Sequence, residues 1–398
     1  MSQPPHLPYG RHLVEDDDIA AVVAALRSDF IAHGPRVAEF EQALTRATGA
    51  HEAVACASGT AALHLALTAL DVGPGDVCVV PAQTFLSTAT AARLCGAEVV
   101  FADVDPDSGL MTAATLAEAL ARTPGGRAKA VLPVHLGGRL CDMAAIAPVA
   151  RAAGAAIVED AAHAIGGQDA HGHRVGDCAH SDAATFSFHP VKTLAAGEGG
   201  AVTLNDPARA ERMRRLRNHG VTRDPALMGE PHSFDANGAP NPWAYDQLEL
   251  GFNYRMNEME AALGLSQLGK LSRFTARRAA LAARYDRLLA PLATRLRPTP
   301  SPHGGHPALH LYSVLVEFEA AGVTRAELMR RLAAQGIGTQ VHYIPLYRQP
   351  YFRKLYDEMR LPGAEAYYAR VLALPLFPAM LDEDVDRVVG ALAGVLGV

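Results

Sequence analysis

Cysteine is scarce in this 398-residue chain, and its spacing argues against cysteine-based frameworks. The five cysteines are odd in number and lie far apart, so we expect neither a disulfide framework nor a paired-cysteine zinc site. No apolar run approaches the roughly 20 residues that a membrane-spanning helix needs. A basic segment followed by an apolar one, typical of secretory signals, is also lacking. We therefore expect a soluble, cytoplasmic protein without a membrane partner.

Basic residues are slightly outnumbered, and no lysine/arginine block is long enough to follow a phosphate backbone. The 36 basic and 42 acidic residues give a net charge of −6, so we expect no nucleic-acid partner. The composition is otherwise that of a globular protein, with 49% hydrophobic and 20% charged residues. The length allows two domains with substantial cores.

Strands and helices alternate from residue 54 onward. Apolar strand segments separated by amphipathic helices predict an α/β fold with a largely parallel sheet covered on both faces. Ligands of such sheets bind at the carboxyl ends of the strands. Residues 257–288 read as strongly helical and lead to a smaller C-terminal domain, in which residues 310–317 and 339–343 read as strands. The polar segment 222–247, which holds the only tryptophan, Trp243, is long enough to suggest a function or an oligomer contact.

One lysine stands in an unusual setting within FSFHPVKTLAAGEGG, residues 186–200. Lys192 is flanked by apolar residues and glycines, and burial of a long cation is costly unless it is paired or neutral. A lysine with a lowered pKa can attack an aldehyde and form a Schiff base. This stretch alone fits a surface lysine as well as a covalent cofactor anchor, so the rest of the chain must decide.

Polar residues follow several of the predicted strands. Ser58-Gly59-Thr60 opens a helix and fits a phosphate cup, although it is also a good helix N-cap. Asp160 ends the strand AAIVED, where its carboxylate can hold a pyridine nitrogen protonated or simply cap a helix. His163 can face the same cavity or be a core histidine.

Two further residues fall near the same edge of the sheet. Phe85 offers an aromatic face, with core packing as the alternative. The Ser187 hydroxyl can bind a phosphate or lie on the strand surface. A metal site is not indicated, because the histidines and the cysteine of segment 171–180 match no metal-binding spacing and two glycines favour a turn there: His171, His173, Cys178 and His180.

A phosphate cup, an aromatic plate, a strand-end acid and a downstream lysine are together the parts of a pyridoxal phosphate (PLP) site. The sequence resembles the DegT/DnrJ/EryC1/StrS family of sugar aminotransferases, which are PLP enzymes of fold type I. The resemblance covers nearly the whole chain and is carried by the runs GPRVAEFE, SGTAALHLAL, PAQTFLSTA, VEDAAHAIGG, SFHPVKTLAAGEGGAVTLND, LELGFNYRMNEMEAALGLSQL and VHYIPLYRQPYF.

The resemblance implies a role for each of several residues around the cofactor. Lys192 binds PLP covalently, Asp160 pairs with its pyridinium nitrogen and His163 lies beside its ring hydroxyl. Phe85 stacks on the ring. The phosphate is held by Ser58, Gly59, Thr60 and Ser187, and by Asn253 from a second subunit, which implies a homodimer with a shared active site. The implied fold is a large domain with a mainly parallel seven-stranded sheet and an N-terminal arm, residues 1–250, and a smaller α+β domain, residues 251–398.

The resemblance is strongest to the aminotransferases of pseudaminic acid biosynthesis. These enzymes aminate C4 of a UDP-linked 4-keto-6-deoxy-N-acetylhexosamine, and the family analogy implies glutamate as the amino donor. Candidate substrate contacts are Arg223, Arg255, His342 and Tyr343, each of which surface pairing or core packing would explain as well. The segments IAHGP and CASGT depart from those relatives, so the sugar stays open.

Three other functions compete with this one. A GDP- or dTDP-linked keto-sugar is the nearest alternative substrate. A sugar dehydratase of the same fold is disfavoured because its family members replace the Schiff-base lysine with histidine. A non-catalytic PLP-binding protein is disfavoured by the complete set of acid, lysine and phosphate ligands.

Overall fold

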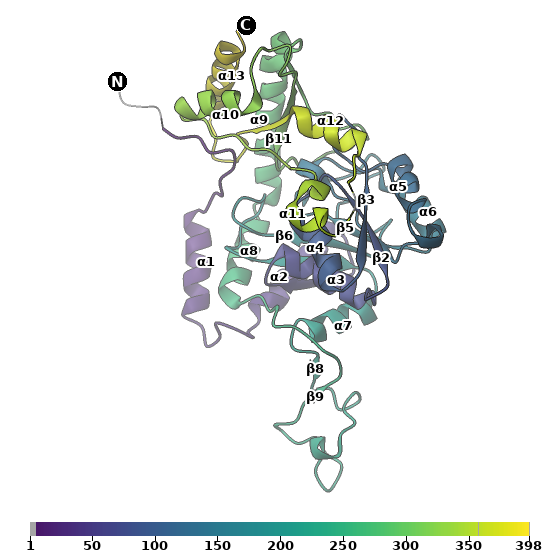
Figure 1. Ribbon diagram of the computed structural model, residues 1–398. Helices are drawn as coiled ribbons and strands as arrows, with labels where there is room; N and C mark the ends of the chain where they lie inside the picture. Colours follow the sequence, from purple (N-terminus) through teal and green to yellow (C-terminus); the bar gives the residue numbers. More distant parts are fainter. Residues whose placement is uncertain (1–4, 357, 398) are drawn as a thin grey trace.

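The fold is organised around a large sheet in which most strands run parallel (Figure 1). The computed structural model describes residues 5–356 and 358–397, and within them seven strands form this sheet in the order β1-β7-β6-β5-β4-β2-β3. Only β7 runs antiparallel to its neighbours. The strands are β1 (Glu52–Cys56), β2 (Val77–Pro81), β3 (Glu98–Ala102), β4 (Ala130–Val131), β5 (Ala156–Asp160), β6 (Ala183–Ser187) and β7 (Gly200–Leu204). The predicted α/β class is confirmed.

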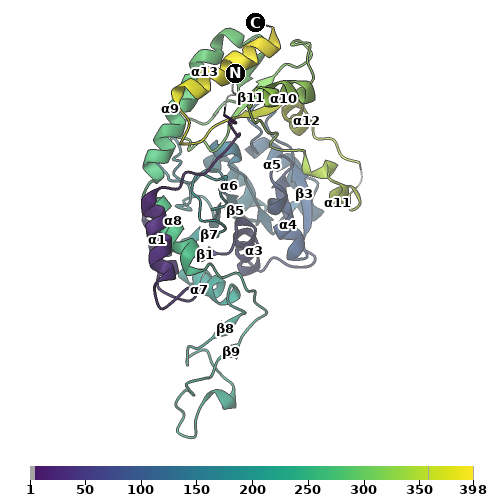
Figure 2. The same cartoon turned by 90° about the vertical axis from the view of Figure 1, so that its left-hand side faces the viewer.

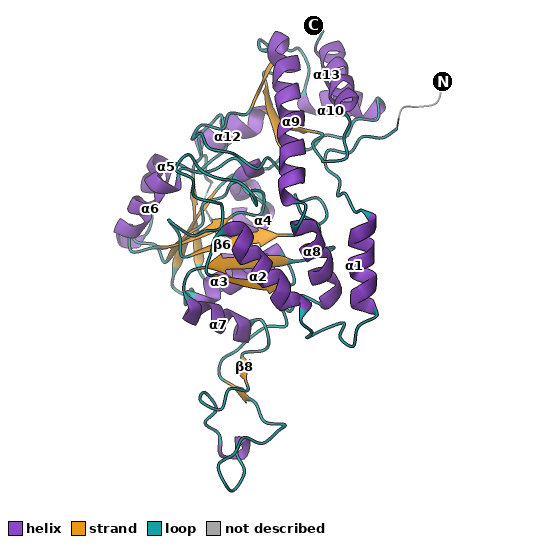
Figure 3. Cartoon of the chain, turned by 180° about the vertical axis from the view of Figure 1, so that it is seen from behind, coloured by secondary structure: helices purple, strands orange, loops and turns teal. Residues whose placement is uncertain are grey.

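Alternation along the strands sends side chains into cores on opposite faces. Val54 of β1 packs into one buried cluster, whereas Ala53 and Ala55 pack into another. Helices cover both faces of the sheet (Figure 3). The helices of this part are α1 (Asp16–Leu26), α2 (Arg36–Thr48), α3 (Gly59–Ala69), α4 (Leu86–Leu94), α5 (Ala113–Leu120), α6 (Met143–Ala152), α7 (Pro207–Leu216) and α8 (Glu258–Leu268).

The C-terminal part adds a small antiparallel sheet flanked by helices. Its strands follow the order β10-β11-β12. Its elements are α9 (Leu271–Leu289), β10 (Leu296–Pro298), β11 (Tyr312–Val316), α10 (Arg325–Ala334), α11 (Pro350–Arg353), α12 (Pro362–Arg370), β12 (Val371–Leu374) and α13 (Asp382–Leu396). The predicted domain boundary at residue 250 stays a prediction; α8, which follows it, packs on α1 and α2.

The helical prediction for residues 257–288 is confirmed, although the segment forms two helices: α8 ends at Leu268 and α9 starts at Leu271. One other predicted element of this part is wrong. Segment 339–343 is not a strand, because its pairing is limited to a single bridge between Gln340 and Ala373 of β12.

A long arm projects from the body between β8 (Val221–Thr222) and β9 (Asp246–Gln247) (Figures 1 and 2). The Asp246 carboxylate organises it by accepting hydrogen bonds from the Gly229 amide at 2.8 Å and from the Ser233 hydroxyl. The Trp243 side chain on this arm is 72% exposed.

The N-terminal residues form a strap over the C-terminal part. Leu7 is buried there and pairs with Ile337, its amide donating to the Gly336 carbonyl at 2.8 Å. Further along, the Tyr9 carbonyl accepts from the Leu376 amide at 3.0 Å. Among the described residues, no helix combines the length and apolarity needed to cross a membrane.

Candidate active site

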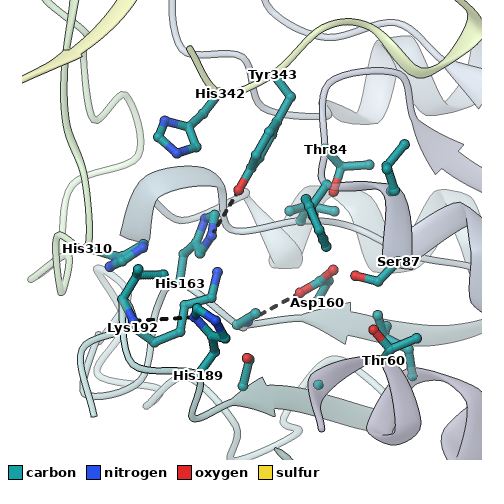
Figure 4. A pocket seen from close by; sticks show the side chains of 18 of the residues that line it. Thr60, Thr84, Ser87, Asp160, His163, His189, Lys192, His310, His342 and Tyr343 are labelled. Atoms are coloured by element: carbon teal, nitrogen blue, oxygen red, sulfur yellow. Dashed lines mark hydrogen bonds between the residues drawn. The ribbon is translucent and has the colours of Figure 1, made fainter. Parts of the chain in front are cut away.

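A cavity of about 790 Å³ opens where the carboxyl ends of the large sheet meet the C-terminal part. Asp160 at the end of β5 lines it (Figure 4). Ser187 at the end of β6 also lines it, as the parallel topology predicts. The structure brings ten of the predicted site residues to this cavity: Ser58, Gly59, Thr60, Phe85, Asp160, His163, Ser187, Lys192, His342 and Tyr343.

Lys192 lies on the loop that joins the antiparallel strands β6 and β7. Two hydrogen bonds close the base of this loop, from the Phe188 amide to the Gly199 carbonyl at 2.9 Å and from the Ala196 amide to the Phe188 carbonyl at 2.8 Å. Burial lowers the pKa of the Lys192 amine to about 8, although the charge of Asp160 opposes this shift. The amine is therefore neutral in part of the molecules near physiological pH.

Asp160 is a buried carboxylate with defined donors. One oxygen, Oδ2, accepts from the Thr88 hydroxyl at 2.7 Å, and Oδ1 accepts from the Ala162 amide at 3.2 Å. Burial raises the pKa of Asp160, while the hydrogen bond from Thr88 opposes the rise. The residual lone pairs can accept from a protonated nitrogen in the cavity.

The start of α3 is brought tightly against the ends of β6 and β7. A Cβ added to Gly59 would lie 2.7 Å from the Ser187 Cβ, and one added to Gly200 would lie 2.3 Å from the Ser58 carbonyl oxygen. The Ser58 hydroxyl caps the helix by accepting from the Ala61 amide at 3.1 Å. First-turn amides of a helix lack intrahelical partners and favour anions. The same turn can therefore cap the helix through the Ser58 hydroxyl and bind an anion through its free amides.

His163 has a defined tautomer. Its Nδ1 accepts from the Gly137 amide at 3.1 Å, so Nε2 carries the proton, 3.4 Å from the Tyr343 hydroxyl oxygen. Burial and the nearby Lys192 charge hold the pKa of His163 well below its usual value. Its ring is therefore a neutral donor toward the cavity.

The C-terminal part contributes a second wall of neutral rings. Burial lowers the pKa of His342 to about 3 and holds that of His310 well below its usual value. The His310 ring lies 4.7 Å from the His163 ring, and Tyr9 of the strap lies 5.5 Å from His342, centroid to centroid. This wall can donate hydrogen bonds to an uncharged, hydroxyl-rich ligand.

The aromatic candidate Phe85 lies at the mouth of the cavity. Its side chain is half-exposed, and its ring centroid is 5.7 Å from that of Tyr343. The face of Phe85 is thus free to cover a planar ligand.

Three predicted residues do not reach the cavity of their own chain. Asn253 is exposed and forms an antiparallel bridge with Asn218, whose side chain also accepts from Arg255 at 2.7 Å. Arg223 lies on the arm, its guanidinium 6.0 Å from the Tyr245 ring centroid. Among the described residues that line the cavity there is no arginine.

Other cavity residues escaped the sequence reasoning. Tyr9 and His310 come from the strap and from the segment before β11, and no local motif marks either position. His189 and Thr84 stood inside quoted motifs, next to residues that were assigned a role. The motifs therefore contained both residues, but a histidine or threonine at such a position is equally common in an ordinary loop.

Comparison with known proteins identifies one family over nearly the whole chain. Residues 13–393 match the model of the DegT/DnrJ/EryC1/StrS aminotransferase family. The structure is similar to that of PseC from Helicobacter pylori, an aminotransferase involved in the biosynthesis of pseudoaminic acid, with 25% identity and a TM-score of 0.88 over 98% of this chain and 99% of that one.

Two other solved structures bear on the ligands. The PLP form of a sugar aminotransferase, Spr1654 from Streptococcus pneumoniae, is 28% identical with a TM-score of 0.86, over 98% of this chain and 99% of that one. DesI, solved in the presence of its TDP-sugar product, is 30% identical with a TM-score of 0.84, over 100% of this chain and 94% of that one.

Proposed function

Because this chain belongs to the DegT/DnrJ/EryC1/StrS family of PLP-dependent sugar aminotransferases, we propose that it aminates the C4 keto group of a UDP-linked 4-keto-6-deoxy-N-acetylhexosamine. Glutamate is the proposed amino donor. The observation that carries the proposal is the joint presence of Lys192, Asp160 and His163 in one cavity. The likeness to PseC supports the choice of sugar.

The residues of the cavity fit PLP. Lys192 would hold the cofactor covalently, Asp160 its ring nitrogen and His163 its ring hydroxyl, with Phe85 over the ring face. The phosphate would lie in the cup at the start of α3, where Gly59 packs so closely on Ser187 that a Cβ at position 59 would clash. Ser58, Thr60 and Ser187 line this cup. Bound there, PLP supplies an electron sink for negative charge on the substrate carbon.

The chain's own residues carry the proton transfers. Lys192, with a pKa of about 8, can exchange a proton with the substrate carbon as a general acid and base. Asp160 keeps the ring nitrogen protonated. The neutral rings of His342 and Tyr343 would position the sugar, because donors of this kind match hydroxyl groups without attracting free anions.

A second copy of the chain would complete the site. A nucleotide diphosphate, the cofactor phosphate and the carboxylates of glutamate all need cationic or amide partners, yet the described lining of the cavity holds no arginine. Asn253 and Arg255 contact a common residue, Asn218, near the base of the arm. We propose that these residues, with Arg223, serve the cavity of the partner in a homodimer.

The proposed reaction is tested by supplying glutamate with UDP-, GDP- and dTDP-linked 4-keto-6-deoxy sugars and identifying amino-sugar products by mass spectrometry. The UDP-linked N-acetyl sugar should react fastest. Preference for a dTDP-linked sugar would favour the alternative raised by DesI. Lys192→Ala should abolish turnover, whereas Lys354→Ala, on an exposed lysine, should retain it. Absence of product with every sugar would contradict the function.

A further inference from the structure

Behind the cavity, two buried threonines lead from the start of α4 to Asp160. The Thr84 and Thr88 hydroxyl oxygens are 2.8 Å apart, and Thr88 Oγ1 is 2.7 Å from Asp160 Oδ2. Both threonine side chains are almost fully buried. Neither has a role in the function proposed above, apart from the place of Thr84 in the lining.

The geometry fixes the direction of these hydrogen bonds. An ionised carboxylate only accepts hydrogen bonds, so the single hydroxyl proton of Thr88 must be donated to Asp160. The alternative acceptor, the Phe85 carbonyl, is more distant at 3.3 Å. Thr88 Oγ1 is then an acceptor for Thr84, which donates. The relay therefore runs from Thr84 through Thr88 to Asp160.

We infer that Thr88 is a positioning residue whose hydroxyl, oriented by Thr84, keeps the Asp160 carboxylate ionised and aimed at the ring nitrogen of the cofactor. The inference rests on the proposed cofactor site. Asp160 Oδ2 has no other protein donor within the described residues. Loss of the Thr88 hydroxyl leaves this buried oxygen without its donor, which favours the protonated acid.

The groups around Asp160 do not substitute for this hydroxyl. The charges of Lys192 and His135 lower the pKa of Asp160, as does the Ala162 amide, but burial outweighs them all. The Tyr343 hydroxyl, 3.4 Å from His163 Nε2, has its pKa raised by burial and by the charge of Asp160, and it stays neutral. His135 is held by the Glu159 carboxylate at 2.7 Å. A change in Thr88 should therefore be felt directly in the ionisation of Asp160.

The test measures binding of PLP itself to the apoprotein as a function of pH. A ring N–H pairs with ionised Asp160, so affinity falls as the pH drops through the pKa of this acid. In Thr88→Val that pKa rises further. The acid limb of the profile, which is the pH range over which affinity falls, should therefore move to higher pH by about one unit. At a given pH on this limb, PLP should bind about tenfold more weakly than to the wild-type protein. Thr88→Ser, which keeps the hydroxyl, should restore the wild-type limb.

A second readout reports the proton directly. With PLP labelled with ¹⁵N in the ring, the Thr88→Val protein should show a shift toward the unprotonated nitrogen, because the more basic Asp160 takes the proton. Thr84→Val should move both readouts in the same direction by less. Thr48→Val is the matched control, since its buried hydroxyl donates to the Leu44 carbonyl at 2.9 Å, on another helix.

The outcomes separate the two proposals. Failure of the wild-type protein to bind PLP would contradict the cofactor site itself. Normal PLP binding with an unmoved acid limb and an unchanged ¹⁵N shift in Thr88→Val would overturn the role of Thr88 alone. If Thr88→Val does not fold, the same two measurements are made on Thr84→Val. An acid limb that does not move in Thr84→Val would count against the relay.

Discussion

Burial gives the Lys192 amine a reactivity that an exposed lysine lacks. An ordinary lysine titrates near about 10.4, whereas the pKa of Lys192 is lowered to about 8. Only the neutral amine attacks an aldehyde. Desolvation by the surrounding walls, rather than a neighbouring cation, is the main cause of the shift.

Capture of PLP by the apoprotein should follow this titration. The association rate should rise with pH and level off above a pH of about 8, as stopped-flow absorbance can measure. Asp160→Asn removes a charge that raises the pKa of Lys192, so its profile should lie at lower pH. Lys192→Ala should show no covalent phase. A wild-type rate still rising near pH about 10 would contradict a lowered pKa.

The sequence predicts some residues of the site and misses others, and individual residues show why. Ser58 and Lys192 follow strands and Asp160 ends one, so local patterns predict that they share one edge of the sheet. Thr88 and His310 have no such mark. Their roles depend on contacts across distant segments, such as the His310 amide donating to the Gly137 carbonyl at 3.0 Å.

Among the elements, the N-terminal strap ties the cavity wall to the C-terminal part. Leu7 lies in a buried cluster with residues of α9, β11 and α13, and its neighbour in the cavity wall, Tyr9, follows two residues later. Anchoring of Leu7 therefore places Tyr9 beside His342.

Truncation of this anchor should cost stability. Leu7→Ala removes a buried side chain at the margin of a core, and we expect a loss of about 2 kcal/mol in the free energy of unfolding, measured by urea denaturation. Leu381→Ala, at a side chain that is 64% exposed, should change it by less than about 0.5 kcal/mol. Equal effects of the two substitutions would show that the strap does not pack as described.

Two segments of the C-terminal half show where periodicity stops being informative. The apolar repeat continues across Gly269, so it predicts a helical segment but does not reveal that a new helix starts at Leu271. TQVHY predicts a strand, yet its pairing is limited to a single bridge between Gln340 and Ala373 of β12. How far a segment pairs with a neighbouring strand depends on tertiary packing, which a local pattern does not contain.

At the scale of the whole molecule, the arm presents exposed aromatic side chains that the proposed homodimer would cover. Trp243 and Tyr245 are both more than half exposed there. Isolated apolar side chains are ordinary on a surface, whereas several on one extended arm favour a contact with another chain. In the proposed homodimer the arm would lie against the partner.

Trp243 makes this testable without a label, because it is the only tryptophan of the chain. Its fluorescence should be blue-shifted in concentrated protein and shift red on dilution, over the same range in which sedimentation shows the dimer dissociating. Leu227→Glu, on the arm, should move both transitions to higher concentration. A dimer whose tryptophan emits as if fully exposed would contradict docking of the arm.

The antiparallel placement of β7 has a consequence for how the chain folds. β6 and β7 pair as neighbours in sequence, so the loop with Lys192 is closed by short-range contacts that form quickly. Asp160 and Thr88, by contrast, are 72 residues apart and meet only after slower crossover connections are made. We therefore expect a refolding chain to form the lysine hairpin early, with the amine still solvated and protonated. Competence to capture PLP would then appear last, together with the complete sheet.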